Sequence, residues 1–222
     1  MKRWTRIDSA VMPDGKIVAL DEHDGSYSVR VGGAELMSTR RHASEENLAE
    51  LACAHTTGIS EARILIGGLG FGFTLQAALG VLGPDAIVIV AEILGAVIAW
   101  NRDPSLPLAA EAMNDPRVMV LEKDVADVIG ESSRAFDSII LDVDNGPDAL
   151  STGGNGRLYS TEGLRMSRNA LRAGGCLGIW SAAPDAAFER TMAAAGFSVE
   201  TQRCQARVKA GSWHTIFLGR VK

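Results

Sequence analysis

Three acids each stand at the end of a different apolar segment, and together they could bind a nucleoside. Glu92 closes one such segment, Asp124 the next, and Asp142 the one after that. Because the carboxyl ends of parallel strands meet at the ligand-binding edge of a sheet, these side chains should lie close together. Glu92 stands 22 residues after Gly70 (92 − 70), where an acid can accept bonds from both ribose hydroxyls. Asp124 could accept a bond from an adenine amino group, and Asp142 should lie beside the reacting carbon. Each acid could instead be a helix N-cap or a solvated turn residue.

A glycine-rich turn precedes the acids, in Ile64-Leu65-Ile66-Gly67-Gly68-Leu69-Gly70-Phe71-Gly72. Residues without side chains let the backbone approach a bound nucleoside closely. The dinucleotide pattern G-x-G-x-x-G is not met, because Phe73 stands where its third glycine is required. The spacing present is typical of S-adenosylmethionine sites, although glycines also serve tight packing at strand ends. We predict that the cofactor-binding glycines are Gly67, Gly68, Gly70 and Gly72.

The apolar residues of the elements that must position these side chains follow two different patterns along the chain. Up to about Ser38 the apolar pattern alternates between turn signals, which predicts an antiparallel meander with strands at Ile7–Ala10, Lys16–Glu22, Ser26–Val31 and Glu35–Ser38. Ser44 should cap the helix that follows. From Ala62 onward apolar strands alternate with helices, as in a doubly wound, Rossmann-like α/β sheet. The predicted strands are Arg63–Ile66, Ile87–Ala91, Val118–Leu121, Phe136–Leu141 and Cys176–Trp180, with a final β-hairpin that turns across Ala210-Gly211. We expect an N-terminal β module (residues 1–43) and a nucleoside-binding domain (residues 44–222).

Composition narrows the possible partners. The formal net charge is −5, and Lys and Arg are not clustered, which argues against nucleic-acid binding. The apolar stretch Ala86–Trp100 contains Glu92 and is too short to cross a bilayer. Cys53, Cys176 and Cys204 form no CxxC pair, and no spacing resembles a metal site. With no apolar segment of signal-peptide type at the N-terminus, we expect a cytoplasmic protein without a metal or a membrane partner.

These motifs resemble the spermidine/spermine synthase family, a branch of the class I S-adenosylmethionine-dependent methyltransferase fold. The similarity covers most of the chain and adds to the glycine turn and the three acids the segments Asp115-Pro116-Arg117-Val118, Phe136–Asp142, Gly146-Pro147, Leu158-Tyr159 and Ala173-Gly174-Gly175. The resemblance implies S-adenosylmethionine or its decarboxylated form as co-substrate, a small-molecule acceptor and a homodimer. It also implies that Glu92 holds the ribose, that Asp124 holds the adenine, and that Asp142 helps to deprotonate an attacking amine.

The polyamine-site motifs of the family are altered in this chain. Gly70 replaces an aspartate of the glycine turn, and Leu75-Gln76 replaces an Arg-Glu pair. The catalytic-loop pattern D-S-x-D-P becomes Asp142-Val143-Asp144-Asn145-Gly146-Pro147, Trp180 stands in place of a glutamine, and Asn47 lies near the place of a tyrosine. A glycine in place of the aspartate leaves room for the carboxylate of S-adenosylmethionine, which favours methyl over aminopropyl transfer.

The sequence therefore predicts a transferase that moves a methyl or aminopropyl group to a small, amine-type acceptor, with Asp142 and Asp144 as catalytic residues. A non-catalytic nucleoside-binding or assembly protein is the alternative, favoured by the missing polyamine contacts. Asp144 and Asn145 could equally be ordinary turn residues, and segment 151–156 could be a lid. Weaker candidates for substrate contact are His42, Asn145, Tyr159 and Trp180. We assign no role to His23 or His214.

Overall fold

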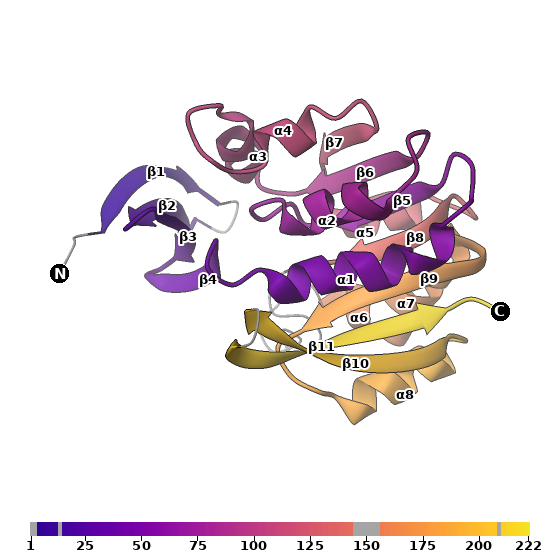
Figure 1. Cartoon of the computed structure of the whole chain (residues 1–222). Helices are drawn as coiled ribbons and strands as arrows, with labels where there is room; N and C mark the ends of the chain where they lie inside the picture. The colour runs from indigo at the N-terminus through magenta and orange to yellow at the C-terminus, as the bar shows by residue number, and fades with distance from the viewer. Residues whose placement is uncertain (1–3, 13–14, 144–155, 208–209) are drawn as a thin grey trace.

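The computed structural model describes residues 4–12, 15–143, 156–207 and 210–222, which form a small sheet and a large one (Figure 1). The small sheet contains strands β1 (Thr5–Val11), β2 (Ile17–His23), β3 (Ser26–Val31) and β4 (Ala34–Ser38) in sequential antiparallel order. Two-residue turns join its later strands. Asp24 and Gly25 both have positive φ values (54° and 74°), as a hairpin turn of matching twist requires. The predicted antiparallel module is thereby confirmed.

The large sheet has the strand order β10-β11-β9-β8-β5-β6-β7. Its parallel strands are β5 (Arg63–Gly67), β6 (Ile87–Glu92), β7 (Val118–Glu122), β8 (Phe136–Leu141) and β9 (Leu171–Ser181), and its antiparallel hairpin is β10 (Ser198–Arg207) with β11 (Ala210–Arg220). The order reverses between the neighbours β5 and β8, because the chain first moves outward through β6 and β7. In doubly wound sheets ligands bind at the carboxyl ends beside this reversal.

Helices cover the two faces of the large sheet (Figure 1). On one face α1 (Ala43–Cys53), α2 (Phe73–Val81), α3 (Gly95–Arg102) and α4 (Ala110–Met113) contribute to one apolar core. The 3₁₀ turn η1 (Ala54–Thr56) directly follows α1. On the other face a second core includes side chains of α5 (Val125–Gly130), α6 (Gly156–Tyr159), α7 (Thr161–Ala170) and α8 (Ala186–Ala194). Val18, Leu20 and Val29 of the small sheet belong to the first core, so that core continues from one sheet to the other. The predicted doubly wound class is confirmed.

Several predicted boundaries were wrong, each because a specific contact overrides the local signal. Ser44 is not the N-cap of α1; His42 is, and Ser44 lies buried in the first turn. α3 begins only at Gly95, and the Leu94 amide just before it donates to the Glu92 carboxylate. The C-terminal hairpin turns before Ala210, since Arg207 already pairs with Ala210. The sequence also gave no indication of the four-residue helices α4 and α6.

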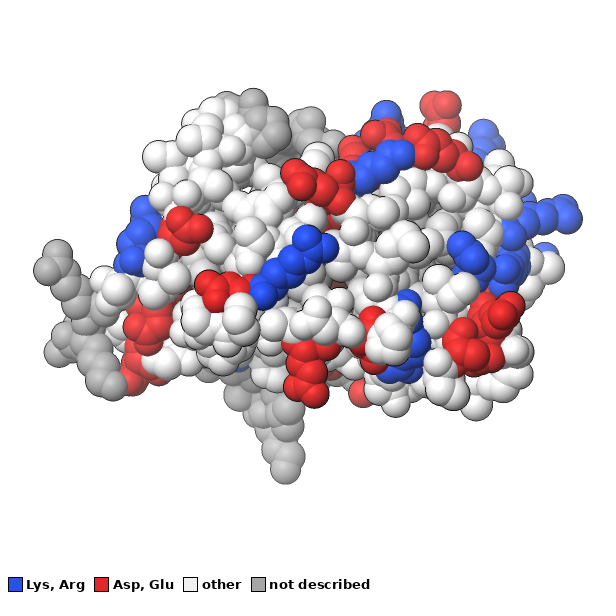
Figure 2. Space-filling model, turned by 90° about the horizontal axis from the view of Figure 1, so that it is seen from above, with Lys and Arg blue, Asp and Glu red and all other residues white. Residues whose placement is uncertain are grey.

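Charge on the visible face is mixed. Basic side chains are interspersed with acidic ones in the view from above, rather than gathered into one patch (Figure 2). Within the described residues no helix combines the length and apolar character needed to span a bilayer.

Candidate functional site

The glycine turn connects β5 to α2, and its residues have distinct reasons to be glycine. Gly68 has a φ of 89°, and a Cβ there would lie 2.3 Å from the Asp142 carbonyl oxygen. A Cβ at Gly72 (φ 78°) would lie 2.3 Å from the Ala109 Cβ, and one at Gly67 would lie 2.8 Å from a Val125 methyl group. Gly70 differs, because its φ is 53° but the nearest atom to an added Cβ is the Met37 sulfur at 3.5 Å. Gly67 and Gly72 therefore serve packing, whereas Gly68 and Gly70 border a cavity.

That cavity, here the glycine-loop cavity, has a volume of about 250 Å³. It lies at the carboxyl ends of β6, β7 and β8 and is closed on one side by the small sheet. Its walls are formed by Met12, Val29, Leu36, Met37, Gly68, Gly70, Ala91, Glu92, Ile93, Leu94, Val97, Lys123, Asp124, Val125, Asp142 and Val143. All three acids predicted from the strand ends thus meet at one cavity.

Glu92 is held rigidly at the end of β6. Its Oε2 accepts a hydrogen bond from the Leu69 amide at 2.9 Å, and its Oε1 accepts one from the Leu94 amide at 2.8 Å. The residue is 8% exposed. Each carboxylate oxygen can accept more than one hydrogen bond. The two amides therefore orient the carboxylate and leave it able to accept further hydrogen bonds. The backbone amides fix the direction in which the carboxylate faces the cavity.

Asp124 is a helix N-cap that also forms part of the cavity wall. It caps α5, where its Oδ1 accepts from the Ala126 amide at 2.8 Å, and it lines the glycine-loop cavity. Ile93, a large apolar side chain that is 57% exposed, lines the same cavity. The cavity can therefore offer a flat ligand both an apolar contact and a hydrogen-bond acceptor.

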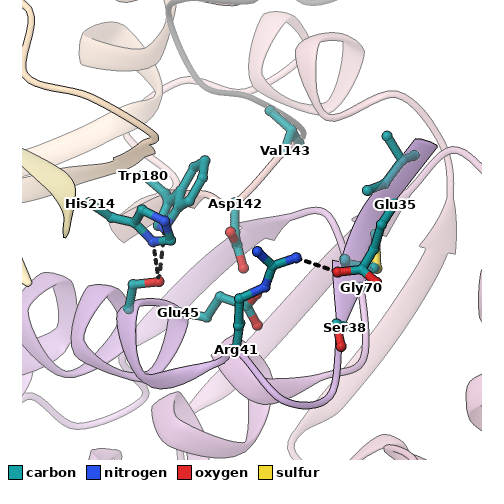
Figure 3. Close-up of a pocket in the computed structure, with 12 residues that line it drawn as sticks. Glu35, Ser38, Arg41, Glu45, Gly70, Asp142, Val143, Trp180 and His214 are labelled. Atoms are coloured by element: carbon teal, nitrogen blue, oxygen red, sulfur yellow. Dashed lines mark hydrogen bonds and ion pairs between the residues drawn. The ribbon is translucent and has the colours of Figure 1, made fainter. Parts of the chain in front are cut away.

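A second cavity of about 230 Å³ adjoins the first, and we call it the α1 cavity. The residues that line it are Glu35, Leu36, Met37, Ser38, Arg41, Ser44, Glu45, Gly70, Asp142, Val143, Trp180 and His214 (Figure 3). Five residues line both cavities, so the two meet there: Leu36, Met37, Gly70, Asp142 and Val143.

Asp142 directly follows β8 and occupies this junction. Its amide donates to the Gly67 carbonyl at 3.0 Å, and its Oδ2 accepts from the Thr74 hydroxyl at 2.5 Å. The side chain is therefore fixed from α2 at the point where the strand order reverses. This carboxylate therefore faces both cavities.

Three side chains that line the α1 cavity, from Trp180, Ser44 and His214, are joined by hydrogen bonds (Figure 3). The indole N–H of Trp180 donates to Ser44 Oγ at 3.1 Å, and Ser44 Oγ lies 2.9 Å from Nδ1 of His214. Nε2 of His214 lies 3.0 Å from the Ser212 hydroxyl. Because Ser44 already accepts from Trp180, its own O–H can donate to Nδ1 of a neutral imidazole. Burial, followed by the nearby Arg41, lowers the pKa of His214, which favours this neutral form.

Charged residues at the entrance complete the α1 cavity. The Arg41 guanidinium pairs with the Glu35 carboxylate. Glu45 lines the same cavity, and its pKa is raised well above the usual value by burial, then by Asp142 and Glu46. The sequence analysis did not identify Arg41, Glu45 or His214. Glu45 has an ordinary explanation as an acid in the first turn of a helix, and His214 reaches the site only through the register of the C-terminal hairpin.

Two residues predicted to contact the substrate, His42 and Tyr159, lie outside the lining of both cavities. His42 stacks on Phe73, with ring centroids 4.3 Å apart, and its Nδ1 pairs with Glu46 at 2.9 Å. Tyr159 is 1% exposed and packs edge-on against Phe188 in the second core. Neither residue lines the two cavities, because each is already held by protein neighbours. Trp180 does line the α1 cavity. Asp144, Asn145 and nearly all of the predicted lid fall in segment 144–155, outside the described residues.

Comparisons with known proteins identify the fold. No protein-family model matches the chain, and no curated protein sequence matches it significantly. Among solved structures, spermidine synthase from Thermotoga maritima superposes with a TM-score of 0.75 at 20% identity, covering 96% of this chain and 72% of that one. A spermidine synthase in complex with the transition-state analogue AdoDATO gives 0.73 at 19%, with the same coverage. The CurJ carbon methyltransferase gives 0.56 at 14%, covering 80% and 54%. The chain therefore has the spermidine-synthase-like variant of the class I methyltransferase fold, as its motifs predicted.

Proposed function

We propose that this protein binds S-adenosylmethionine and transfers its methyl group to a small amine. The observation that carries the proposal is the convergence of Glu92, Asp124 and Asp142 on one cavity beside the glycine turn. Acids at these strand ends suit the three parts of an adenosyl donor: ribose, base and reacting carbon. One similar structure, a spermidine synthase, was solved in complex with the transition-state analogue AdoDATO.

The nucleoside would occupy the glycine-loop cavity. Glu92 would accept bonds from the ribose hydroxyls, because its carboxylate is already oriented by the Leu69 and Leu94 amides. The adenine would lie against Ile93, with its amino group directed to Asp124. The methionine tail would then extend past Gly70 to the junction with the α1 cavity.

The residues around Gly70 favour a donor that keeps its carboxylate. Gly70 contributes no acid to bind a lone ammonium, and the space beside it is open. Among the described residues that line the α1 cavity, Arg41 is the one Lys or Arg side chain. Arg41 could exchange its pairing with Glu35 for the methionine carboxylate, an interaction that the decarboxylated donor cannot make.

The chemistry is an in-line displacement at carbon. An amine nitrogen in the α1 cavity attacks the methyl carbon, the bond from carbon to sulfur breaks, and its electron pair stays on the neutral thioether. The attacking nitrogen must first lose a proton if it arrives as an ammonium, and Asp142 at the junction is placed to accept it. Alignment of nitrogen, carbon and sulfur supplies most of the remaining acceleration.

Donor choice provides the direct test. Calorimetric titration should show that S-adenosylmethionine binds at least as tightly as its decarboxylated form. Arg41→Gln should weaken S-adenosylmethionine roughly three- to tenfold, because a half-exposed ion pair contributes about 1 kcal/mol, and should leave the decarboxylated donor unchanged. Arg40→Gln is the matched control, since Arg40 bonds to Ser26 and His23 outside both cavities. Binding of the decarboxylated donor alone, with conversion of putrescine to spermidine, would show that the protein is an aminopropyltransferase.

We also propose that the small sheet forms a homodimer. Its outer strand β1 is almost wholly exposed, and the apolar residues Val11 and Ile17, which pair across β1 and β2, are 74% and 55% exposed. A sheet this small gains stability by covering such residues. Deletion of residues 1–38 should give monomers or aggregates. Because that deletion also removes core residues, Val11→Lys with Ile17→Lys is the cleaner variant.

The double variant should change the mass measured by light scattering from dimer to monomer, while the melting temperature stays close to that of the wild type. Met119→Lys serves as the control, because Met119 is similarly exposed (54%) on β7 of the large sheet. A dimer that persists in the double variant would rule out this interface.

A further inference from the structure

Glu45 is a half-buried carboxyl group without a hydrogen bond or ion pair among the described residues. It projects from the first turn of α1 into the α1 cavity, toward the same space as Asp142 from the end of β8 (Figure 3). A carboxyl group withdrawn from water without a partner costs free energy. Its position facing a cavity indicates that the missing partner is a ligand.

The other charged groups around Glu45 are already engaged. Arg41 pairs with Glu35, Glu46 pairs with His42, and Asp142 accepts from Thr74. His214 contributes a neutral ring bonded to Ser44. No described cation therefore compensates Glu45, and the pKa of Glu45 is raised by burial first and then by its acidic neighbours Asp142 and Glu46.

We propose that Glu45 is a substrate-binding residue, which together with Asp142 binds the positively charged nitrogen of the amine acceptor. The inference rests on the proposed function and adds to it the group that recognises the acceptor. A cation between two carboxylates relieves their mutual repulsion and compensates the burial of both. The Trp180 ring lines the same cavity, and aromatic faces attract cations as well.

This assignment also accounts for the altered catalytic loop. Asp144 is shifted from the place where the family's loop pattern has its second acid. Glu45 supplies a second carboxyl group to the same cavity from a different element. Two acids that face one space select for charge on the acceptor and leave its carbon chain to the remaining cavity wall.

Proton exchange follows from this arrangement. In the empty cavity Glu45 holds a proton more readily than an exposed glutamate does, and an arriving ammonium displaces that proton to solvent. The bound ammonium then gives one proton to Asp142, and the free amine takes the methyl group while the thioether leaves. The product departs as a methylammonium, and the proton on Asp142 returns to solvent, so charge and atoms balance.

The unliganded protein provides a first test through its stability. A carboxyl group with a raised pKa in the folded state binds more protons when folded than when unfolded, so stability falls as the pH rises from the ordinary glutamate range through the raised value. Glu45→Gln removes this loss. The variant and the wild type should melt alike in acid, and the variant should melt higher near neutral pH and above. Glu46→Gln, the adjacent acid on the same helix, should show no such gain. Equal melting curves for Glu45→Gln and the wild type at every pH would contradict the assignment.

A second test uses n-butylamine and its neutral counterpart n-butanol as probes, with melting temperature as the readout. The amine should raise the melting temperature of the wild-type protein, whereas butanol should have no comparable effect. Glu45→Gln should need at least about tenfold more amine for the same increase, corresponding to 1.4 kcal/mol. Equal responses of the wild type and Glu45→Gln, equal responses to both probes, or no response to the amine would each overturn the proposal.

Adenosine titration of the same proteins distinguishes failure of the proposed donor site from failure of the role proposed for Glu45. If the wild-type protein does not bind adenosine, the proposed donor site is refuted. If adenosine binds normally and Glu45→Gln responds to the amine as the wild type does, only the role of Glu45 is refuted.

Discussion

Replacing Asp142 by asparagine should lower the rate of methyl transfer by about 10²- to 10⁴-fold, the usual contribution of a positioned proton acceptor. Asparagine has nearly the same shape and can still accept from the Thr74 hydroxyl, so the junction between the cavities should keep its structure. It cannot take a proton from the acceptor's nitrogen. The measurement is the initial rate of S-adenosylhomocysteine formation, with an amine that supports turnover by the wild type.

Donor affinity provides the control for this variant. Asp142 lines both cavities, while Glu92 and Asp124 line only the glycine-loop cavity, where the nucleoside is proposed to bind. Calorimetry should therefore show a donor affinity within a few-fold of the wild-type value. A variant that turns over normally would transfer the role of proton acceptor to another group, of which Glu45 is the first candidate.

Glu92→Ala should reduce the affinity for S-adenosylhomocysteine by at least about tenfold, equivalent to 1.4 kcal/mol. Each charge-assisted bond to a ribose hydroxyl contributes about 1.5–3 kcal/mol, and the variant loses two of them. It also leaves the Leu69 and Leu94 amides without their acceptor. The loop that carries Gly68 and Gly70 should become less well ordered, which adds to the loss.

Glu122→Ala is the matched control. Glu122 ends the neighbouring strand β7 but is exposed and lines neither cavity. Its replacement should leave donor affinity unchanged. A folded Glu92→Ala protein that binds the nucleoside normally would show that the glycine-loop cavity is not the donor site, and the melting temperature of each variant verifies folding.

The sequence was sufficient to predict the fold and the meeting of three strand-end acids beside the glycine turn. Parallel strands covered on both faces read as continuous apolar runs, and β8 was predicted with the same ends that the structure shows. Glu92, Asp124 and Asp142 could be found because each directly follows such a run. Their convergence is a property of the sheet topology, so it required no knowledge of side-chain packing.

Most of the α1 cavity could not be predicted, because its residues meet only through long-range packing. Serine is a preferred N-cap residue, yet Ser44 is hydrogen-bonded to Trp180 and His214. These two residues come from strands more than a hundred residues away along the chain. Glu45 looks like an acid placed for the helix dipole. His42 and Tyr159 were chosen for their positions in motifs, whereas contacts with Phe73 and Phe188 engage them elsewhere.

The junction at Gly70 and Asp142 has a consequence for the order of events during turnover. Because the two cavities share these residues, a bound donor becomes part of the wall that its co-substrate meets, and the reverse is equally true. Under the proposed chemistry each ligand thus completes the chamber of the other, and both must be present before the sulfonium is shielded from water. The proposed reaction would then run through a ternary complex, in which the methyl group passes directly between the two small molecules without residing on the protein.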